Sequence, residues 1–477
     1  MADTIYTPTP GNDPNLKNLY HAMQYSPDGY PELRTASRIE IDAISNINVS
    51  VSPSVEVSNF PTVQNVTGDA NISLADNAQN SAFNRLRTSG TSLLGEFRSF
   101  YGTTGNVEMI THTVGSGIIS SNLITKYTTL SVTTDSGDRA VRQSRQYHPY
   151  IPGTSNIGMI TFVFGFPINN LQQTVGMNDD NDGIFLRMNG ATVQFVIRKH
   201  GIDSEIVNQD NWNVDSFDGN GPSGINIDWT KAQIVVIDYQ WLGVGRVRVG
   251  FSVNGRIFYA HYFSHINSVT EPYMTQPSLP VRWEITNLAA TVSPSSMRAI
   301  CYGVYSEGSA EETGFINSAS NGVTSKSINS ASGIGMLAVR LKNSVNGVPV
   351  KAFARVKNWN IITDQDIFYK VLLLQGSSSL SGTPAWTPAT PTGWCEYTTS
   401  FTLSSDPGTN TVVLYQGYAQ GGSKNAGGGS TLLVTSERSA AIYQNFANSD
   451  SMIVAIVGYK LSSDATSYAA LDWIEIK

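Results

Sequence analysis

Cysteine is nearly absent from this chain. Cys301 and Cys395 are the only two cysteines among 477 residues, so no framework of disulfides can hold the protein together. Charge is scarce too: 14% of the residues are Asp, Glu, Lys or Arg, whereas about 25% is usual in soluble domains. The net charge of −7 argues against the basic face of a nucleic-acid-binding protein. We therefore expect no nucleic-acid partner.

Long apolar runs are also missing. No stretch approaches the roughly 20 consecutive apolar residues with which a helix spans a bilayer, so we expect no membrane insertion. The opening sequence MADTIYTPTPGNDPN has neither the basic start nor the apolar segment of a secretory signal. These absences predict a protein made in a cytosol.

What the chain does contain is typical of β structure. It has 42 glycines and 40% hydrophobic residues, and its apolar runs are short and separated by turn residues. Long amphipathic helical patterns are nearly absent. Such turn-separated strands predict an all-β protein built from sandwiches or barrels. Examples of the strand-like runs are MITFVFGF, AQIVVIDYQW, RVRVGFSV, IFYKVLLL and MIVAIVGYK.

Changes in composition divide the chain into five parts. We predict an extended N-terminal arm over residues 1–45 and a short β-stem over 46–80. A lectin-like or jelly-roll β-sandwich should follow over 81–314, and a second β-sandwich should cover 336–477. The Ser/Asn/Gly-rich stretch 315–335 offers little to bury and is interpreted as a linker.

One β-hairpin can be predicted with its register. Asn254-Gly255 lies between two alternating runs and is typical of a type I′ turn, which needs positive φ at both central residues. Pairing from this turn places Phe251 opposite Phe258 and Val249 opposite Ala260. These residues share an apolar face that should meet the core.

The opposite face of this hairpin mixes arginine with aromatic residues. Arg246 and Arg248 alternate with the apolar positions, and Tyr259 belongs to the same face. Two interpretations stay open. The arginines either form a surface patch for anions or glycans, or they form structural ion pairs with Asp238 or Glu284.

The segment INVSVSPSVEVSNFPTVQNVTG presents thin strands that nothing nearby in the sequence could cover. Prolines interrupt it, and isolated strand pairs are marginal in water. Three copies around an axis would bury the apolar side chains and pair the strand edges, so we predict a homotrimer, with a twofold dimer as the alternative. The residues expected to form the trimer stem are Val49, Val51, Val55, Val57, Phe60 and Val63.

The run NDDNDGIF suggests two alternatives. Asp179, Asp180 and Asp182 lie beside asparagines and a glycine, and clustered carboxylate and amide oxygens suit Ca²⁺. The spacing lacks the regular pattern of a calcium loop, and Asp and Asn also favour tight turns. Ca²⁺ is therefore the one cofactor considered, and a tight turn is the favoured interpretation.

No motif in the sequence marks an enzyme. Neither a paired-carboxylate signature, a complete nucleophile turn nor a metal-binding histidine spacing is present, so we expect no catalytic residues. Trp386 and Trp394 lie in SGTPAWTPATPTGWCEY, a Pro/Thr-rich stretch that predicts a loop. Large aromatic side chains on such a loop would suit recognition of a surface, and we interpret this loop as the recognition site.

Six ordered segments between residues 81 and 285 resemble a family of virion structural proteins of tailed bacteriophages and some large DNA viruses. The segments are SAFNRLRTS, RQSRQYHPYIPGTS, NDDNDGIFLRMNG, WNVDSFDGNGPSGINID, IDYQWLGVGRVRVGF and YMTQPSLPVRWEI. The resemblance implies a particle component with a lectin-like or jelly-roll sandwich, and it carries no catalytic residues. The Val/Ser-rich stem segment is separately similar to segments that precede many phage fibre domains.

This resemblance implies a function as a virion structural protein. We expect a trimeric fibre or baseplate-associated appendage that contributes to host-surface attachment. It would be assembled in the host cytoplasm and anchored to other virion proteins by the arm 1–45. A host-surface glycan is a candidate partner. The alternatives are a capsid decoration or head-fibre protein and a virion-borne polysaccharide depolymerase.

Overall fold

The structure is a computed structural model that describes residues 23–25, 31–33, 91–100, 107–308, 314–405, 411–422 and 441–476. The chain divides into two compact units, Met1–Ser73 and Leu74–Lys477. In the first unit, β1 (Met23–Tyr25) pairs antiparallel with β2 (Pro31–Leu33). The six predicted stem residues, Val49 to Val63, lie outside the described residues.

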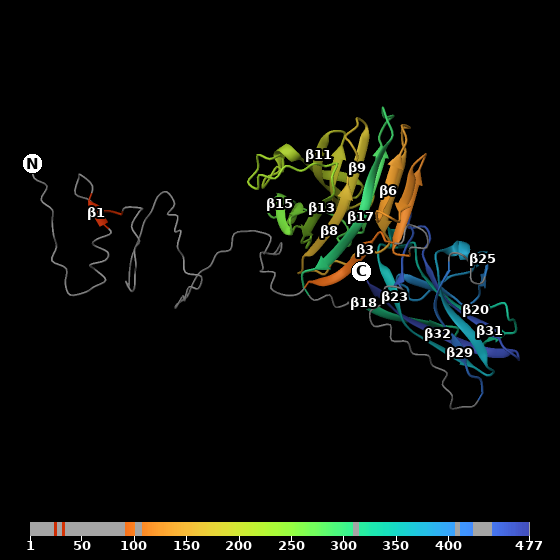
Figure 1. Cartoon of the computed structure of the whole chain (residues 1–477). Helices are drawn as coiled ribbons and strands as arrows, with labels where there is room; N and C mark the ends of the chain where they lie inside the picture. The colour runs from red at the N-terminus through yellow and green to blue at the C-terminus, as the bar shows by residue number, and fades with distance from the viewer. Residues whose placement is uncertain are drawn as a thin grey trace, which may run out of the picture. The chain divides into compact units, whose positions relative to one another are not determined.

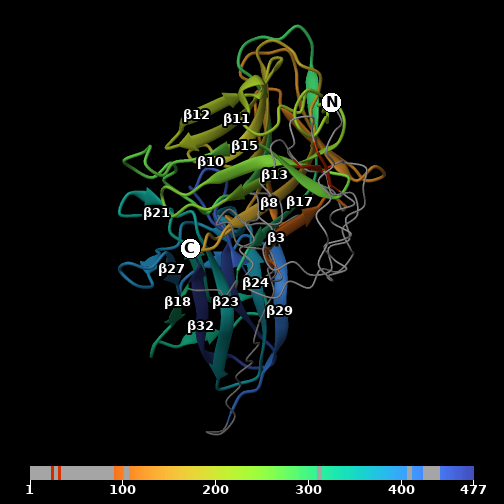
Figure 2. The ribbon, with the colours of Figure 1, turned by 90° about the vertical axis from the view of Figure 1, so that its left-hand side faces the viewer.

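Strands dominate the second unit. The described residues contain only two helical segments, both 3₁₀ turns: η1 (Gln209–Asn211) and η2 (Ser377–Ser379). No described helix is long and apolar enough to cross a membrane. The strands form two successive β-sandwiches, seen from two directions in Figures 1 and 2. The all-β, two-sandwich prediction is therefore confirmed for the described residues.

The first sandwich consists of a seven-stranded and a larger antiparallel sheet. In spatial order the seven strands are β12 (Ile202–Asn208), β11 (Thr192–Lys199), β10 (Gly183–Asn189), β9 (Leu171–Asn178), β16 (Val281–Asn287), β7 (Arg139–Ser144) and β4 (Met109–Val114). The larger sheet runs β15 (Arg256–Phe263), β14 (Val247–Val253), β13 (Gln233–Tyr239), β8 (Asn156–Val163), β17 (Ser295–Ser306), β6 (Tyr127–Val132) and β5 (Ile118–Asn122), and β3 (Ser92–Arg98) also pairs with β17.

Inward- and outward-facing residues alternate along these strands, and the inward-facing apolar side chains of both sheets form one core. Val247, Val249 and Phe251 of β14 are fully buried and face Phe195 and Val175 of the opposite sheet within the same cluster. Each such side chain contributes about 1.5 to 3 kcal/mol when it leaves water. The core of the first sandwich therefore follows from the period-2 pattern of its sequence.

The predicted hairpin is present, and its register changes halfway. Asn254 and Gly255 both have positive φ, and Phe251 pairs with Phe258 as predicted. A β-bulge then shifts the register, so that Val249 pairs with His261 instead of Ala260. The bulge is explained by a contact from outside the hairpin. The backbone N–H groups of Val214 and Asp215 both donate to the Ala260 carbonyl, which takes Ala260 out of the pairing with β14. A bulge leaves one residue out of the hydrogen-bonded ladder, so the predicted register was wrong for the part of β14 from Val249 to Val247.

The arginine face of the hairpin holds a structural ion pair. The Arg248 guanidinium is 2.5 Å from Asp238 Oδ2, and both side chains are fully buried. The two residues are cross-strand partners on β14 and β13. The Tyr259 hydroxyl donates to the same carboxylate oxygen at 2.7 Å. The structural interpretation of Arg248 is therefore confirmed.

The second sandwich also has two main sheets. The first contains β18 (Gly314–Ser320), β32 (Ala465–Ile476), β23 (Phe353–Thr363) and β30 (Ala441–Ile442) in that order, and β19 (Lys326–Ile328) also pairs with β32. The second runs β26 (Thr387–Pro388), β27 (Cys395–Thr398), β20 (Ile334–Leu341), β31 (Ile453–Lys460), β24 (Ile367–Leu374) and β29 (Thr411–Ala419). Two short ribbons pair β21 (Ser344–Val345) with β22 (Val348–Pro349) and β25 (Leu380–Ser381) with β28 (Thr402–Leu403).

The predicted linker 315–335 is part of this second sandwich. Its first half forms β18 and its middle forms β19, and both pair with β32. Ile328 is fully buried in the main core of the sandwich. The linker prediction was wrong because β18 is an edge strand whose side chains are mostly exposed, so its polar composition carries little sign of a strand.

An additional apolar layer covers part of the outer face of the six-stranded sheet. Leu372, Ala455 and Ala338 of this sheet point away from the main core. The segment that contains the ribbon of β25 and β28 packs against them through Leu380 and Phe401. The segment that contains β25 and β28 therefore leaves only part of this outer face open to other partners.

Candidate functional site

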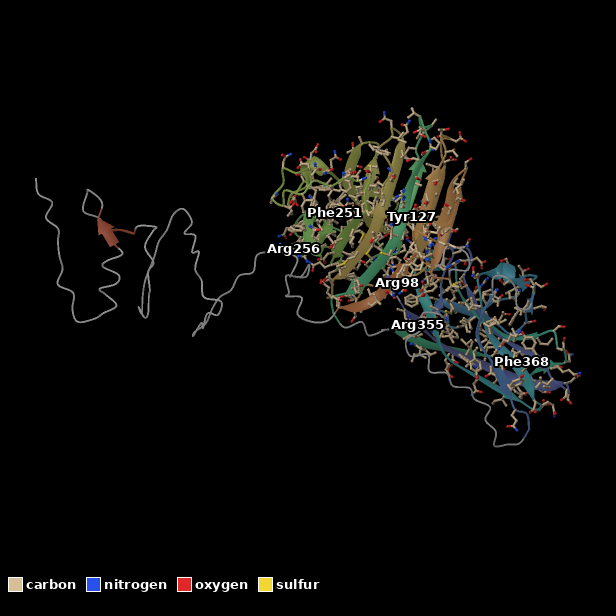
Figure 3. All side chains as sticks on the ribbon, in the orientation of Figure 1. Arg98, Tyr127, Phe251, Arg256, Arg355 and Phe368 are labelled. Carbon is tan, nitrogen blue, oxygen red and sulfur yellow. The ribbon has the colours of Figure 1, made fainter. Side chains whose placement is uncertain are left out.

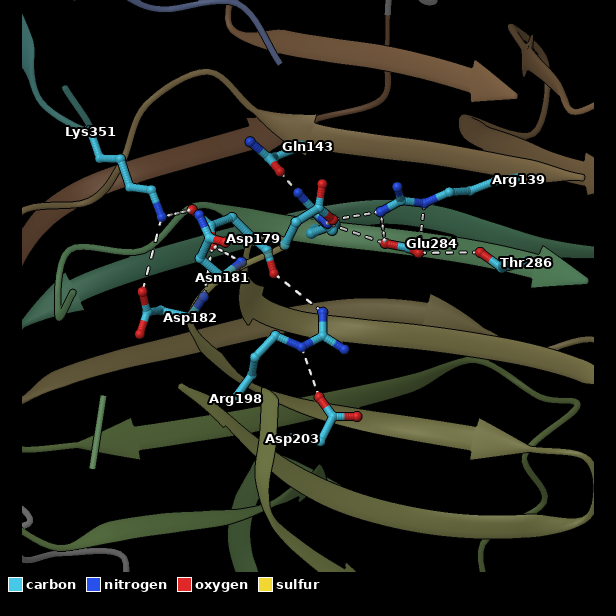
Figure 4. A network of polar contacts seen from close by, with 12 residues as sticks. Arg139, Gln143, Asp179, Asn181, Asp182, Arg198, Asp203, Glu284, Thr286 and Lys351 are labelled. Carbon is cyan, nitrogen blue, oxygen red and sulfur yellow. Dashed lines mark hydrogen bonds and ion pairs between the residues drawn. The ribbon is translucent and has the colours of Figure 1, made fainter. Parts of the chain in front are cut away.

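The predicted metal residues lie on the turn between β9 and β10, seen close up in Figure 4. The Asp179 carboxylate accepts hydrogen bonds from the backbone N–H groups of Asn181 and Asp182 at 2.7 and 2.8 Å. The Tyr147 hydroxyl donates to its other oxygen at 3.0 Å. This is the local side-chain-to-backbone bonding that stabilises an Asx turn.

Asp179 also pairs with a cation from the second sandwich. Lys351 Nζ lies 2.5 Å from its carboxylate, and both side chains are nearly buried. Burial alone would raise the pKa of Asp179, but the Lys351 ammonium and the turn amides hold the pKa below its usual value. Asp179 is therefore ionised and paired at neutral pH.

Asp180 points to a different set of partners. Arg139 and Arg282 each lie 2.6 Å from its Oδ1. Both arginines also pair with Glu284, at 2.8 and 3.2 Å. Burial would raise the pKa of Asp180, but the two guanidinium groups lower the pKa to about 2.

Asp182 is held by a third set of donors. The backbone N–H and the hydroxyl of Thr275 donate to its carboxylate at 2.7 and 2.6 Å, and Lys351 lies 4.0 Å away. The three carboxylates thus share a turn, and each is held by protein donors, with Lys351 lying near both Asp179 and Asp182. The described residues contain no group of three His, Cys, Asp or Glu side chains arranged to hold a metal ion. The geometry corresponds to the turn interpretation.

The same region joins the two sandwiches. Phe446 follows β30, and its ring stacks on His112 of β4 with centroids 4.3 Å apart. The guanidinium groups of Arg282 and Arg139 lie 5.1 and 5.8 Å from the same ring. We call Asp179, Lys351, His112 and Phe446, with these two arginines, the junction. Its partners lie far apart in the sequence, and no local signal marked Lys351 or Phe446.

The two tryptophans of the predicted recognition loop pack against other side chains. Trp386 is half-buried between β25 and β26 and packs on the outer apolar layer. The Arg340 guanidinium lies 4.2 Å from its ring centroid and also pairs with Glu396 at 2.7 Å. Trp386 therefore has a packing role, which corrects the prediction of a freely exposed ring.

Trp394 is also half-buried and lies just before β27. Its side chain packs against the main core of the second sandwich. Its backbone N–H donates to Glu475 Oε2 at 2.9 Å. The two tryptophans pack against different apolar clusters, while most other residues of the Pro/Thr-rich stretch are exposed.

A different set of aromatic side chains lies on the outer face of the six-stranded sheet. Phe368 of β24 pairs in register with Tyr418 of β29 on one side and with Tyr459 of β31 on the other. The ring centroids are 5.4 and 5.3 Å from Phe368. We call these three residues the aromatic row; Figure 3 marks Phe368.

The three residues of the aromatic row differ in exposure, and a pair of polar residues lies beside them. Tyr418 is 74% exposed and Phe368 is half-buried, whereas Tyr459 is nearly buried. Two residues further along β24, Lys370 pairs with exposed Gln416 of β29. The Lys370 ammonium lies 4.6 Å from the Tyr459 ring centroid. The sequence held a signal for this site, because IFYKVLLL and TVVLYQGYA alternate apolar with aromatic or polar residues.

Comparisons with known proteins find likeness in fold only. No family model matches the chain, and no curated protein matches it. Among solved structures, the chain is similar to the lectin UEA-II complexed with galactose, with 10% identity over 45% of this chain and 99% of that chain and a TM-score of 0.28.

Two further solved structures are also similar to this chain. A legume lectin-like domain from Entamoeba histolytica has 10% identity over 41% of this chain and 89% of that chain, with a TM-score of 0.25. A glycosyl hydrolase family 16 protein from Mycobacterium smegmatis has 8% identity over 45% of this chain and 100% of that chain, with a TM-score of 0.32. All three similarities span less than half of this chain.

Proposed function

We propose that this protein is a structural component of a virus particle. In this proposal it is a trimeric fibre or baseplate-associated appendage of a tailed bacteriophage, and its second sandwich contributes to host-surface attachment. The observation that carries the proposal is the resemblance of six ordered segments between residues 81 and 285 to virion structural proteins. The arm 1–45 anchors the chain to other virion proteins, and three equivalent anchors suit a symmetric particle.

The junction is compatible with this function. Three of the resembling segments contribute residues to this region: Gln143 comes from one, Asp179 from the next and Arg282 from the last. Gln143 Oε1 accepts a hydrogen bond from Arg282 at 2.7 Å, and Arg282 pairs with Asp180. In the proposed particle component, these residues have a structural task, namely holding a second sandwich in place.

Antibody labelling of intact particles tests the proposal. Electron microscopy of the virus that encodes this chain should show gold label on the tail or baseplate. Label on the capsid would instead favour the decoration or head-fibre alternative. Particles that carry no label, while the protein is abundant in the infected cell, would contradict a virion role. Release of soluble sugar from host envelopes by the purified protein would favour the depolymerase alternative.

A further inference from the structure

We propose that the aromatic row is a saccharide-binding site on which one sugar ring stacks against Tyr418. Its biological meaning rests on the proposed attachment function, because a receptor site on a virion protein would face the host. The binding itself rests on the geometry of Tyr418, Phe368, Lys370 and Gln416, whatever the role of the whole chain.

The strand register brings these groups together on one side of the sheet. Side chains two residues apart on a strand share a face, so Phe368 and Lys370 point away from the core, while Tyr369 between them is buried. The same alternation puts Tyr418 and Gln416 on the outer face of β29. Neighbouring β-strands are about 4.8 Å apart, so the site is preformed by the sheet and needs no loop to order it.

The exposed ring of Tyr418 is the anchor of the proposed site. The face of an aromatic ring carries partial negative charge, and the C–H groups of a sugar ring carry partial positive charge, so the two surfaces attract. The Phe368 ring lies beneath at an angle of 53° to Tyr418 and supports it from the neighbouring strand. The side-chain amide of Gln416 supplies a donor and an acceptor for sugar hydroxyls.

The size of the open surface favours a sugar over a protein partner. Leu380 and Phe401 cover part of this sheet face, and the proposed site occupies two rows of side chains, those of Phe368 and Lys370, across three strands. Strands lie about 4.8 Å apart and side chains on one face of a strand repeat about every 6.8 Å, so two rows on three strands cover roughly 200 Å². A stable protein interface buries about 800 Å² on each partner. One or two sugar rings match the smaller area.

Saturation-transfer NMR on the full-length protein tests the site. The probes are gluco-, galacto- and N-acetylglucosamine oligosaccharides, each offered singly. We expect at least one to bind with a Kd of about 1 mM or tighter. Tyr418→Ala should weaken that binding at least about tenfold, as expected when an anchoring aromatic is truncated. Tyr418→Phe keeps the ring and should bind within about twofold of the unchanged protein.

Phe166 offers a matched control. It is 75% exposed, against 74% for Tyr418, and it lies in the first sandwich. Phe166→Ala should leave saccharide binding unchanged. The proposal fails if no probe binds, or if Phe166→Ala weakens binding as much as Tyr418→Ala does. It also fails if Tyr418→Ala leaves binding intact or instead changes the native mass of the protein, which would identify the row as a contact between copies.

The two proposals can fail separately. If antibodies label the particle but no probe binds, the saccharide site is wrong and the virion role stands. If a probe binds through Tyr418 but particles carry no label, the site stands and the virion role is wrong.

Discussion

His261 on β15 accepts a hydrogen bond that it can make only while its ring is neutral. The backbone N–H of Asn213 donates to its Nδ1 at 3.1 Å. Burial lowers the pKa of His261 from 6.5 to about 4. At pH values between about 4 and 6.5, His261 is protonated in the unfolded chain but neutral in the folded chain. This contribution to stability is therefore present above the unfolded pKa of 6.5 and is lost as the pH falls from 6.5 towards 4.

His261→Gln tests this pH dependence. Glutamine keeps an acceptor but does not titrate, so the melting temperature of the variant should fall less steeply over this interval than that of the unchanged protein. Differential scanning calorimetry at a series of pH values measures the two slopes. Equal slopes would show that other groups account for the acid sensitivity.

Phe251 and Trp386 should differ strongly in their effect on stability. Phe251 is fully buried, and its ring centroid lies 5.1 Å from that of Phe217 and 5.5 Å from that of Trp229. Phe251→Ala should therefore lower the free energy of unfolding by about 3 to 5 kcal/mol. Trp386 is half-buried beneath Arg340, so we expect Trp386→Ala to cost about 1 to 2 kcal/mol. Urea denaturation measures both, and equal losses would contradict this difference.

At the scale of elements, local signals predicted local structure well. The Asn254-Gly255 turn and the pairing next to it were predictable because the positive φ angles of a type I′ turn select those residue types. The bulge at Ala260 was not predictable, because its donors Val214 and Asp215 come from a distant segment. The same limit applies to the sites. The acidic turn could be predicted from NDDNDG, but not its pairing with Lys351.

The edge strands β18 and β19 should be required for the second sandwich to fold. Together they cover one side of β32, and β19 supplies buried Ile328. A fragment beginning at residue 314 should therefore unfold cooperatively, whereas one beginning at 336 should lose its sharp transition, because one edge of the long strand β32 is left unpaired. Circular dichroism melting of both fragments measures this. A sharp transition in the shorter fragment would return 315–335 to the role of a linker.

At the scale of the whole molecule, the junction should couple the stabilities of the two sandwiches. Lys351→Met keeps an apolar side chain of similar length but leaves the buried Asp179 carboxylate without its cation. Removing one partner of a buried pair costs about 3 to 5 kcal/mol. Urea denaturation followed by tryptophan fluorescence should show this loss, and adding Asp179→Asn should recover much of it.

Lys199 provides the control for this prediction. Its ion pair with Glu271 is also short, at 2.7 Å, but the Glu271 side chain is 71% exposed. Lys199→Met should therefore change the free energy of unfolding by about 0 to 1 kcal/mol. If both lysine variants lose the same amount, the burial of the junction pair does not matter.

The predicted trimer can be tested at the scale of the whole chain. Each apolar stem side chain that leaves water gives roughly 1.5 to 3 kcal/mol, while ordering the backbone costs about 1 to 2 kcal/mol per residue. About half of the stem residues are polar, so we expect the burial available to one chain alone to be too small to offset this cost. Native mass spectrometry should find a trimer for the full chain and weaker association for a fragment that starts at Ser81. A monomeric full chain would contradict the stem.

The buried ion pairs have a consequence for the media in which this protein can persist. Dissolved salt screens charges that face water, over about 8 Å at physiological ionic strength, but it screens buried pairs much less. Arg248 with Asp238 is fully buried, and Lys351 with Asp179 nearly so. With few charges elsewhere in the sequence, the fold should hold almost equally well in dilute fresh water and in brine.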